Sequence, residues 1–153
     1  MSDFDPVLKE WYEGELGGAA FFERLADAAE NDEARKWSLL GRLESATADR
    51  LRAACAEASV PLGEAPAEPT LLEYANTMME LPWQTNMEGL APQIDEAVHQ
   101  IRTQADEAPP AHAEISLDFL AHEEALLAFV RLELEGKDGS PAVESLLEAW
   151  SAG

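Results

Sequence analysis

The sequence predicts an all-α fold, a four-helix bundle with one long crossover. Two observations support this prediction. The helix formers Ala, Leu and Glu dominate the composition, and β-branched residues are scarce. Apolar residues also recur at the spacing of an amphipathic helix through four long segments. With 153 residues, of which 46% are hydrophobic, the chain can bury one core, and we expect a single domain over residues 1–153.

The first two long helices form a predicted hairpin. Asp5 followed by Pro6 is a cap and first-turn pair, which opens a helix predicted over residues 6–29. A short polar turn separates it from the second helix, predicted over residues 33–58. Pro61 then stops the second helix and begins a proline-rich linker.

The middle of the chain predicts a long crossover that contains a short helix. Thr70 and Glu73 have the spacing of a capping box, which opens a helix predicted over residues 71–81. Pro82 ends this helix. An up-and-down bundle with uniformly short loops does not need such a connection, whereas a bundle with one long crossover does.

The second half of the chain predicts another hairpin and a final short helix. Thr85 and Glu88 form a capping box that opens a helix predicted over residues 86–105. Two consecutive prolines separate it from the fourth long helix. The remaining predicted helices cover residues 111–135 and 141–150.

The charge balance excludes some classes of partner. The chain has 31 Asp and Glu against 10 Lys and Arg, and a formal net charge of −21. Nucleic acid and anionic membranes would repel such a surface, so we expect neither as a partner. The amino terminus lacks the pattern of a signal peptide, and no segment is apolar for long enough to cross a bilayer. A cytoplasmic location is therefore expected.

Cysteine and most histidines suggest no chemistry of their own. Cys55 is the only cysteine, so an internal disulfide and a thiolate metal cluster within one chain are excluded, and we expect this residue to fill the core. His99 and His112 fall at positions expected at the surface or in a turn.

Three polar residues fall in the middle of otherwise apolar helix faces. Glu15 lies in the stripe of the first helix, Glu44 in that of the second, and His122 in that of the fourth. A carboxylate buried without a partner is costly, so it is protonated, hydrogen-bonded or bound to a cation. We therefore expect the three residues to share one interior site.

Around these residues the chain resembles the rubrerythrin-like proteins of the ferritin-like superfamily, over roughly residues 6–59 and 86–135. The resemblance is carried by the stretch from Gly14 to Phe22, by the stretch from Leu40 to Glu44, and by Leu51. In that family each hairpin contributes a Glu from its first helix and a Glu-x-x-His from its second, which together hold two iron or manganese ions.

The resemblance places three possible ligands at the six family positions. Glu15 matches the first Glu, and Glu44 matches the Glu of the first Glu-x-x-His. His122 stands where the family has the Glu of the second Glu-x-x-His. The other three positions carry residues that are not the family's ligands: Thr47, Ile94 and Ala125.

These residues leave three functions open. In the first, the bundle is non-catalytic and Glu15, Glu44 and His122 form a metal-free polar network. In the second, the same three residues bind one divalent iron, manganese or zinc ion. In the third, the protein is a di-iron oxidoreductase of rubrerythrin type, which needs further ligands such as Asp118, Glu133 or residues of the crossover.

The last predicted helix carries an apolar stripe that has to be covered. The stripe consists of Val143, Leu146, Leu147 and Trp150. Either it packs back on its own bundle or it seals a homodimer.

Overall fold

The computed structural model describes residues 3–63 and 69–152, and within these residues the structure contains helices and no strand. The all-α prediction is therefore confirmed. The helices are α1 (Asp5–Ala28), α2 (Asn31–Glu57), α3 (Pro69–Met79), α4 (Trp83–Asp106), the short 3₁₀ helix η1 (Pro110–His112), α5 (Ala113–Leu134) and α6 (Ser140–Ala152).

Two of the predicted helix starts are wrong. Asp5 does not cap α1 from outside but is its first residue, and no side chain caps this end of the helix. The fourth element begins at Trp83 and not at the capping box of Thr85, because Pro82 has an extended backbone conformation (φ −63°, ψ 153°). A helix can start directly after such a residue, so Thr85 lies inside the first turn of α4.

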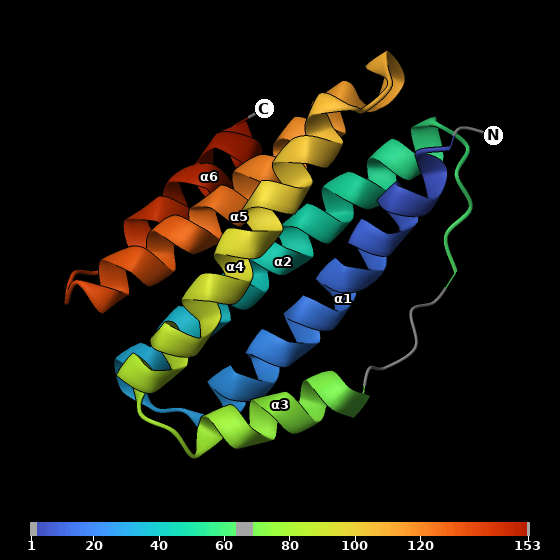
Figure 1. Ribbon diagram of the computed structural model, residues 1–153. Coiled ribbons are helices and arrows are strands. Elements are labelled where there is room, and N and C mark those ends of the chain that lie inside the picture. The colour runs from blue at the N-terminus through green and yellow to red at the C-terminus, as the bar shows by residue number, and fades with distance from the viewer. Residues whose placement is uncertain (1–2, 64–68, 153) are drawn as a thin grey trace.

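The long helices pack as two hairpins, α1 with α2 and α4 with α5 (Figure 1). The helix α2 runs in the same direction as α4 in Figure 1, so the chain must return the length of the molecule between them. This direction is the physical reason for the long crossover. The helix α3 packs on α1. The capping box predicted at Thr70 and the linker over residues 64–68 lie outside what the structure describes.

The terminal helix α6 packs on α5 and α2 of its own chain (Figure 1). Val143, the first residue of its predicted stripe, is fully buried. Leu146, Leu147 and Trp150 are partly buried and pack against the same core. The stripe therefore packs on the bundle of its own chain, which is the first of the two alternatives.

The core follows the predicted stripes. Helix α4 contributes an apolar series to it, made of Met87, Leu90, Ile94, Val98 and Ile101. Cys55 is fully buried and free, as expected of a core-filling residue. His112 is an exception to the prediction, because it lies in η1 but is buried and stacked on Phe4, with 5.8 Å between the ring centroids.

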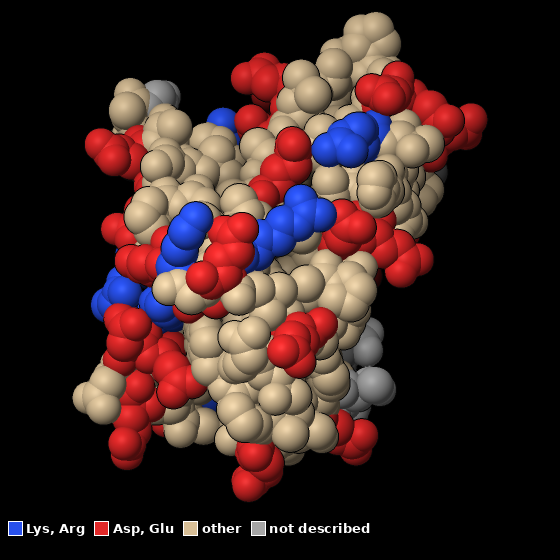
Figure 2. All heavy atoms as spheres, turned by 60° about the vertical axis from the view of Figure 1, so that its left-hand side comes forward, with Lys and Arg blue, Asp and Glu red and all other residues tan. Residues whose placement is uncertain are grey.

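The exterior is acidic. Figure 2 shows acidic side chains spread over one face of the molecule, with Lys and Arg lying among them. Among the helices that the structure describes, none is both long enough and apolar enough to span a membrane.

Candidate functional site

The structure brings the three predicted site residues together in the interior. Glu15 of α1, Glu44 of α2 and His122 of α5 are all buried, and His122 is 0% exposed. The Nε2 atom of His122 lies 2.6 Å from Oε2 of Glu44 and 3.1 Å from Oε2 of Glu15. Three helices from both hairpins therefore meet at this cluster.

A fourth residue, Glu123, completes the cluster and was not predicted from the sequence. Its Oε2 atom lies 3.4 Å from Nδ1 of His122, and its side chain is only 13% exposed. Glu123 lies about 100° around α5 from His122, at the edge of the apolar stripe. The buried Leu120 and Leu127, three residues before it and four after it, are the sequence signal that would have indicated its burial.

The four side chains differ in charge because the pKa of each one responds to burial and to the charges of its neighbours. Burial lowers the pKa of His122, but the carboxylates of Glu15 and Glu44 outweigh burial and raise this pKa well above its ordinary value. Burial also opposes the charge of Glu44, yet the imidazolium and a hydrogen bond from Glu15 hold the pKa of Glu44 below its ordinary value. His122 and Glu44 are thus an imidazolium and a carboxylate in contact.

The two remaining carboxyl groups keep their protons more strongly. Burial, followed by repulsion from Glu44, raises the pKa of Glu15 well above its ordinary value. Burial also raises the pKa of Glu123 to about 7, although the imidazolium of His122 partly opposes this. Glu15 and Glu123 therefore hold their protons to higher pH than Glu44 does, and Glu44 is the carboxylate that faces the charge of His122.

We compared the chain with protein-family models, with curated proteins and with solved structures. None of the three comparisons gave a match.

The cluster also has the elements of a cation site. Glu15, His122 and Glu123 could hold a metal ion, since each offers one ligand atom and these atoms lie within 4.8 Å of one another. Among the described residues, Oε2 of Glu15 and Nδ1 of His122 are buried without a hydrogen-bond partner. Buried polar atoms of this kind call for an explanation, and a bound cation is one.

The other three positions at which the resemblance would place metal ligands are buried, but their residues offer no usual metal ligand. Ile94 and Ala125 are apolar and buried. Thr47 is 1% exposed, and its hydroxyl donates a hydrogen bond of 2.7 Å to the carbonyl oxygen of Leu43 in its own helix. These positions contribute no carboxylate or imidazole to the interior.

The two acids suggested as substitute ligands bind elsewhere. Glu133 accepts hydrogen bonds from Lys36 of α2 at 2.7 and 2.9 Å. Asp118 forms an ion pair of 3.0 Å with Arg50. Neither acid is among the carboxylates in contact with His122, so the structure does not bring them to the predicted site.

Two aromatic rings stack in series on the imidazole ring of His122. Phe119 stacks on His122 with 5.2 Å between ring centroids, and Trp11 stacks on Phe119 with 4.4 Å. The indole N–H of Trp11 donates a hydrogen bond to Gln104 of α4. Both rings are buried, and a buried, less polar environment strengthens the electrostatic interactions beside them.

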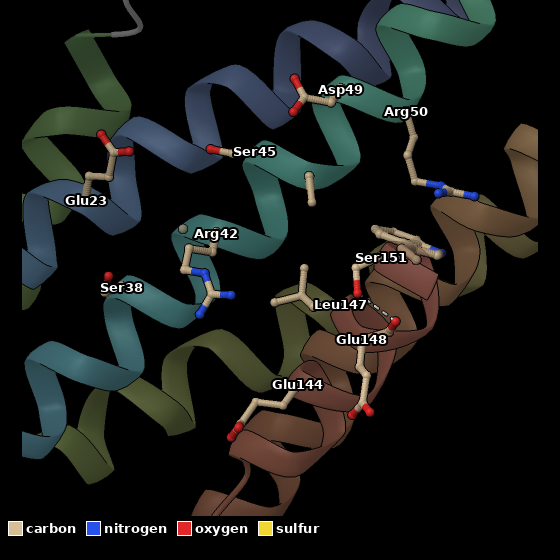
Figure 3. Close-up of a pocket in the computed structure, with 13 residues that line it drawn as sticks. Glu23, Ser38, Arg42, Ser45, Asp49, Arg50, Glu144, Leu147, Glu148 and Ser151 are labelled. Carbon is tan, nitrogen blue, oxygen red and sulfur yellow. Dashed lines mark hydrogen bonds between the residues drawn. The ribbon is translucent and has the colours of Figure 1, made fainter. Parts of the chain in front are cut away.

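A surface groove of about 800 Å³ lies apart from this cluster, between α2 and α6 (Figure 3). None of the four cluster residues lines it. Its walls combine opposite charges, Arg42 and Arg50 with Glu144 and Glu148. Arg50 lies over the ring of Trp150, with 4.6 Å from the guanidinium carbon to the ring centroid, and both residues line the groove.

Proposed function

We propose that this chain is a ferritin-like four-helix bundle of non-catalytic function, in which a self-neutralised polar network occupies the interior. In this proposal the cation of the site is the imidazolium of His122. The observation that carries it is that both ring nitrogens face carboxylates, Nε2 with Glu44 at 2.6 Å and Nδ1 with Glu123 at 3.4 Å. An imidazolium carries a proton on each ring nitrogen, so it suits a ring that has an acidic group near both nitrogens.

A single metal ion fits this arrangement less well. An imidazole that binds a metal does so through the lone pair of one nitrogen, which must then carry no proton. The contact of 2.6 Å between Nε2 and Glu44 has the length of a short charge-assisted hydrogen bond, and it occupies that nitrogen. Glu123 approaches the other nitrogen.

The ferritin-like arrangement is supported by the pairing of the helices. The hairpins α1–α2 and α4–α5 and the crossover between parallel α2 and α4 suit that class of bundle. Two metal ions about 3.5–4 Å apart would need carboxylates and imidazoles from both hairpins. Ile94 and Ala125 replace such groups in the second hairpin, which argues against oxygen chemistry.

In this function the network specifies how the helices assemble. His122 of α5 can satisfy its charge only when α1 and α2 present Glu15 and Glu44 at the same height. Buried ionic groups of this kind favour one helix register over others, at some cost in stability. The bundle would then serve as a rigid scaffold for binding or assembly, and a homodimer is one form that such assembly could take.

One observation favours a second candidate, a mononuclear site for divalent iron, manganese or zinc. Oε2 of Glu15 and Nδ1 of His122 are left without hydrogen bonds, and with Glu123 they lie close enough for one ion. Binding would have to displace the proton of the imidazolium and those of the neighbouring carboxyl groups. The acidic interior would then neutralise a metal cation and not a protonated ring.

Elemental analysis and NMR together separate the two candidates. Protein purified without chelators is analysed for iron, manganese and zinc, and the ring nitrogens of His122 are observed by ¹⁵N NMR near pH 7. The network requires less than about a tenth of an equivalent of metal, with both nitrogens protonated. A stoichiometric metal with one unprotonated nitrogen would support the mononuclear site. His99→Gln and His112→Gln variants assign the His122 signals.

A further inference from the structure

Gly18 lies in the interior of α1, three residues after Glu15. A glycine inside a helix costs roughly 1 kcal/mol relative to alanine. Its φ angle lies outside the left-handed region, so the backbone does not require glycine here. What glycine offers at this position is the space that its missing side chain leaves.

That space is filled by the carboxylate of Glu44. A Cβ atom added at Gly18 would lie 2.7 Å from Oε1 of Glu44, 3.0 Å from its Cδ and 3.4 Å from its Cγ. By contrast, a Cβ atom added at Gly14 in the same helix would meet nothing within 4 Å. At Gly17 the nearest atom would be Cδ2 of Leu71 at 3.3 Å. Close approach to the cluster is therefore specific to Gly18 among these three glycines.

Glu44 cannot move away from such a methyl group without cost. Its other oxygen, Oε2, is bonded to Nε2 of His122 at 2.6 Å, and the residue is 6% exposed. Rotating the carboxylate away from Gly18 would break this short hydrogen bond or drive the carboxylate into packed neighbours. The flexible end of the side chain is thus held from both sides.

We propose that Gly18 is a positioning residue of the interior network. The space left by its missing side chain, which we call the Gly18 seat, accommodates the Glu44 carboxylate and allows it to lie against His122. This inference rests on the proposed function, because it explains how the network obtains its geometry. It also explains why a helix of good helix formers contains a glycine next to the site.

A double-mutant cycle with a matched control tests the seat. The variants are Gly18→Ala, Glu44→Ala, their combination, and Gly14→Ala as the control on the same helix. Urea unfolding gives stability, and ¹H–¹⁵N NMR follows the hydrogen-bonded Nε2 proton of His122. Gly14→Ala should raise the urea midpoint and leave the His122 signal unchanged. Gly18→Ala should increase the unfolding constant by roughly 5- to 150-fold, as overpacking does, and shift or abolish that signal.

The decisive comparison is made in the Glu44→Ala background. There Gly18→Ala should raise the urea midpoint as Gly14→Ala does, because the carboxylate that it displaces is gone. If Gly18→Ala alone does not fold while the double variant does, the same conclusion holds. The inference is overturned if the substitution is equally damaging with and without Glu44, or if it leaves the His122 proton signal unchanged.

The outcome is separable from that of the proposed function. Stoichiometric metal in the purified protein, together with strong coupling between Gly18 and Glu44, would remove the network function and keep the seat. Absence of metal without such coupling would keep the network and remove the seat.

Discussion

Lys36 and Glu133 form a second buried ion pair, 97 positions apart in the chain. Nζ of Lys36 lies 2.7 Å from Oε2 of Glu133. The same carboxylate accepts hydrogen bonds from the indole N–H of Trp83 at 3.0 Å and from the backbone N–H of Gly139 at 2.7 Å. One carboxylate thus joins α2, α4, α5 and the turn before α6.

Replacing Lys36 by Met should destabilise the fold by about 3 kcal/mol, because it leaves the buried carboxylate of Glu133 without its cation. Chemical denaturation measures the change. Arg35→Met is the control, since the ion pair of Arg35 with Asp32 is exposed and its loss should have little effect. Equal losses of unfolding free energy from the two substitutions would show that the buried pair of Lys36 and Glu133 contributes no more to stability than the exposed pair.

Glu123→Gln should stabilise the protein at pH 8. Burial raises the pKa of Glu123 from 4.5 to about 7, so the folded state keeps a proton that the unfolded chain releases. The contribution of this group therefore decreases as pH rises from about 4.5 to about 7 and stays at its lowest value above that. A neutral amide has no such loss, so Glu123→Gln should raise the free energy of unfolding at pH 8 by up to about 3 kcal/mol.

Urea unfolding of Glu123→Gln and of the unmodified protein at pH 5 and pH 8 measures this effect. The stabilisation should be much smaller at pH 5, where the unmodified side chain still keeps most of its proton in the folded state. Glu124→Gln is the matched control, because Glu124 is the next residue in the chain and its carboxylate is half exposed. A gain from Glu123→Gln that is equal at both pH values would contradict the assigned proton.

Glu15→Gln and Glu44→Gln should have different effects near pH 7. Burial raises the pKa of Glu15, so an amide resembles its protonated form, and we expect a change below about 1 kcal/mol. Glu44 is the carboxylate that faces the imidazolium, so its neutralisation should cost about 3 kcal/mol. Unfolding free energies measure both, and a larger loss from Glu15→Gln would reverse the assignment of charge.

The Glu44→Gln variant should also change the titration of His122. The pKa of His122 is raised, so its stabilising contribution is present below the unfolded pKa of about 6.5 and is lost as pH rises through the folded pKa. Glu44→Gln should lower that folded pKa. NMR titration of the ring protons measures the change, and an unchanged midpoint would show that Glu44 does not hold the proton on His122.

Val143→Ala should cost about 1–3 kcal/mol, because it removes two methyl groups from a fully buried position between α6 and the bundle. The exposed neighbour Glu144 provides the control as Glu144→Ala. Thermal unfolding measures the difference. If Val143→Ala had no effect, the packing of α6 on its own chain would contribute little to stability.

Much of the fold could be predicted from local patterns. Helical periodicity placed the apolar series from Met87 to Ile101 on one face of α4, and the structure buries that face. Helix ends were less predictable, as at Asp5 and Thr85. An N-cap depends on how the preceding residue enters the helix, and Pro82 determined this for α4.

The interior cluster could be predicted only in part. Glu15, Glu44 and His122 were recognisable because each interrupts an apolar stripe, and a stripe is a property of one helix. Glu123 and Lys36 lie at stripe edges, where burial depends on the neighbouring helix. Their partners are far away in the chain, as Lys36 and Glu133 show.

The sequence by itself determined that the chain is helical, where its long helices lie, and which polar residues each apolar face carries. The tertiary structure decided which of these residues meet and therefore which of them carry charge. The physical reason is that a helix face follows from spacing along the chain, whereas the protonation of Glu15, Glu44 and His122 depends on distances and burial that arise only when α1, α2 and α5 pack together.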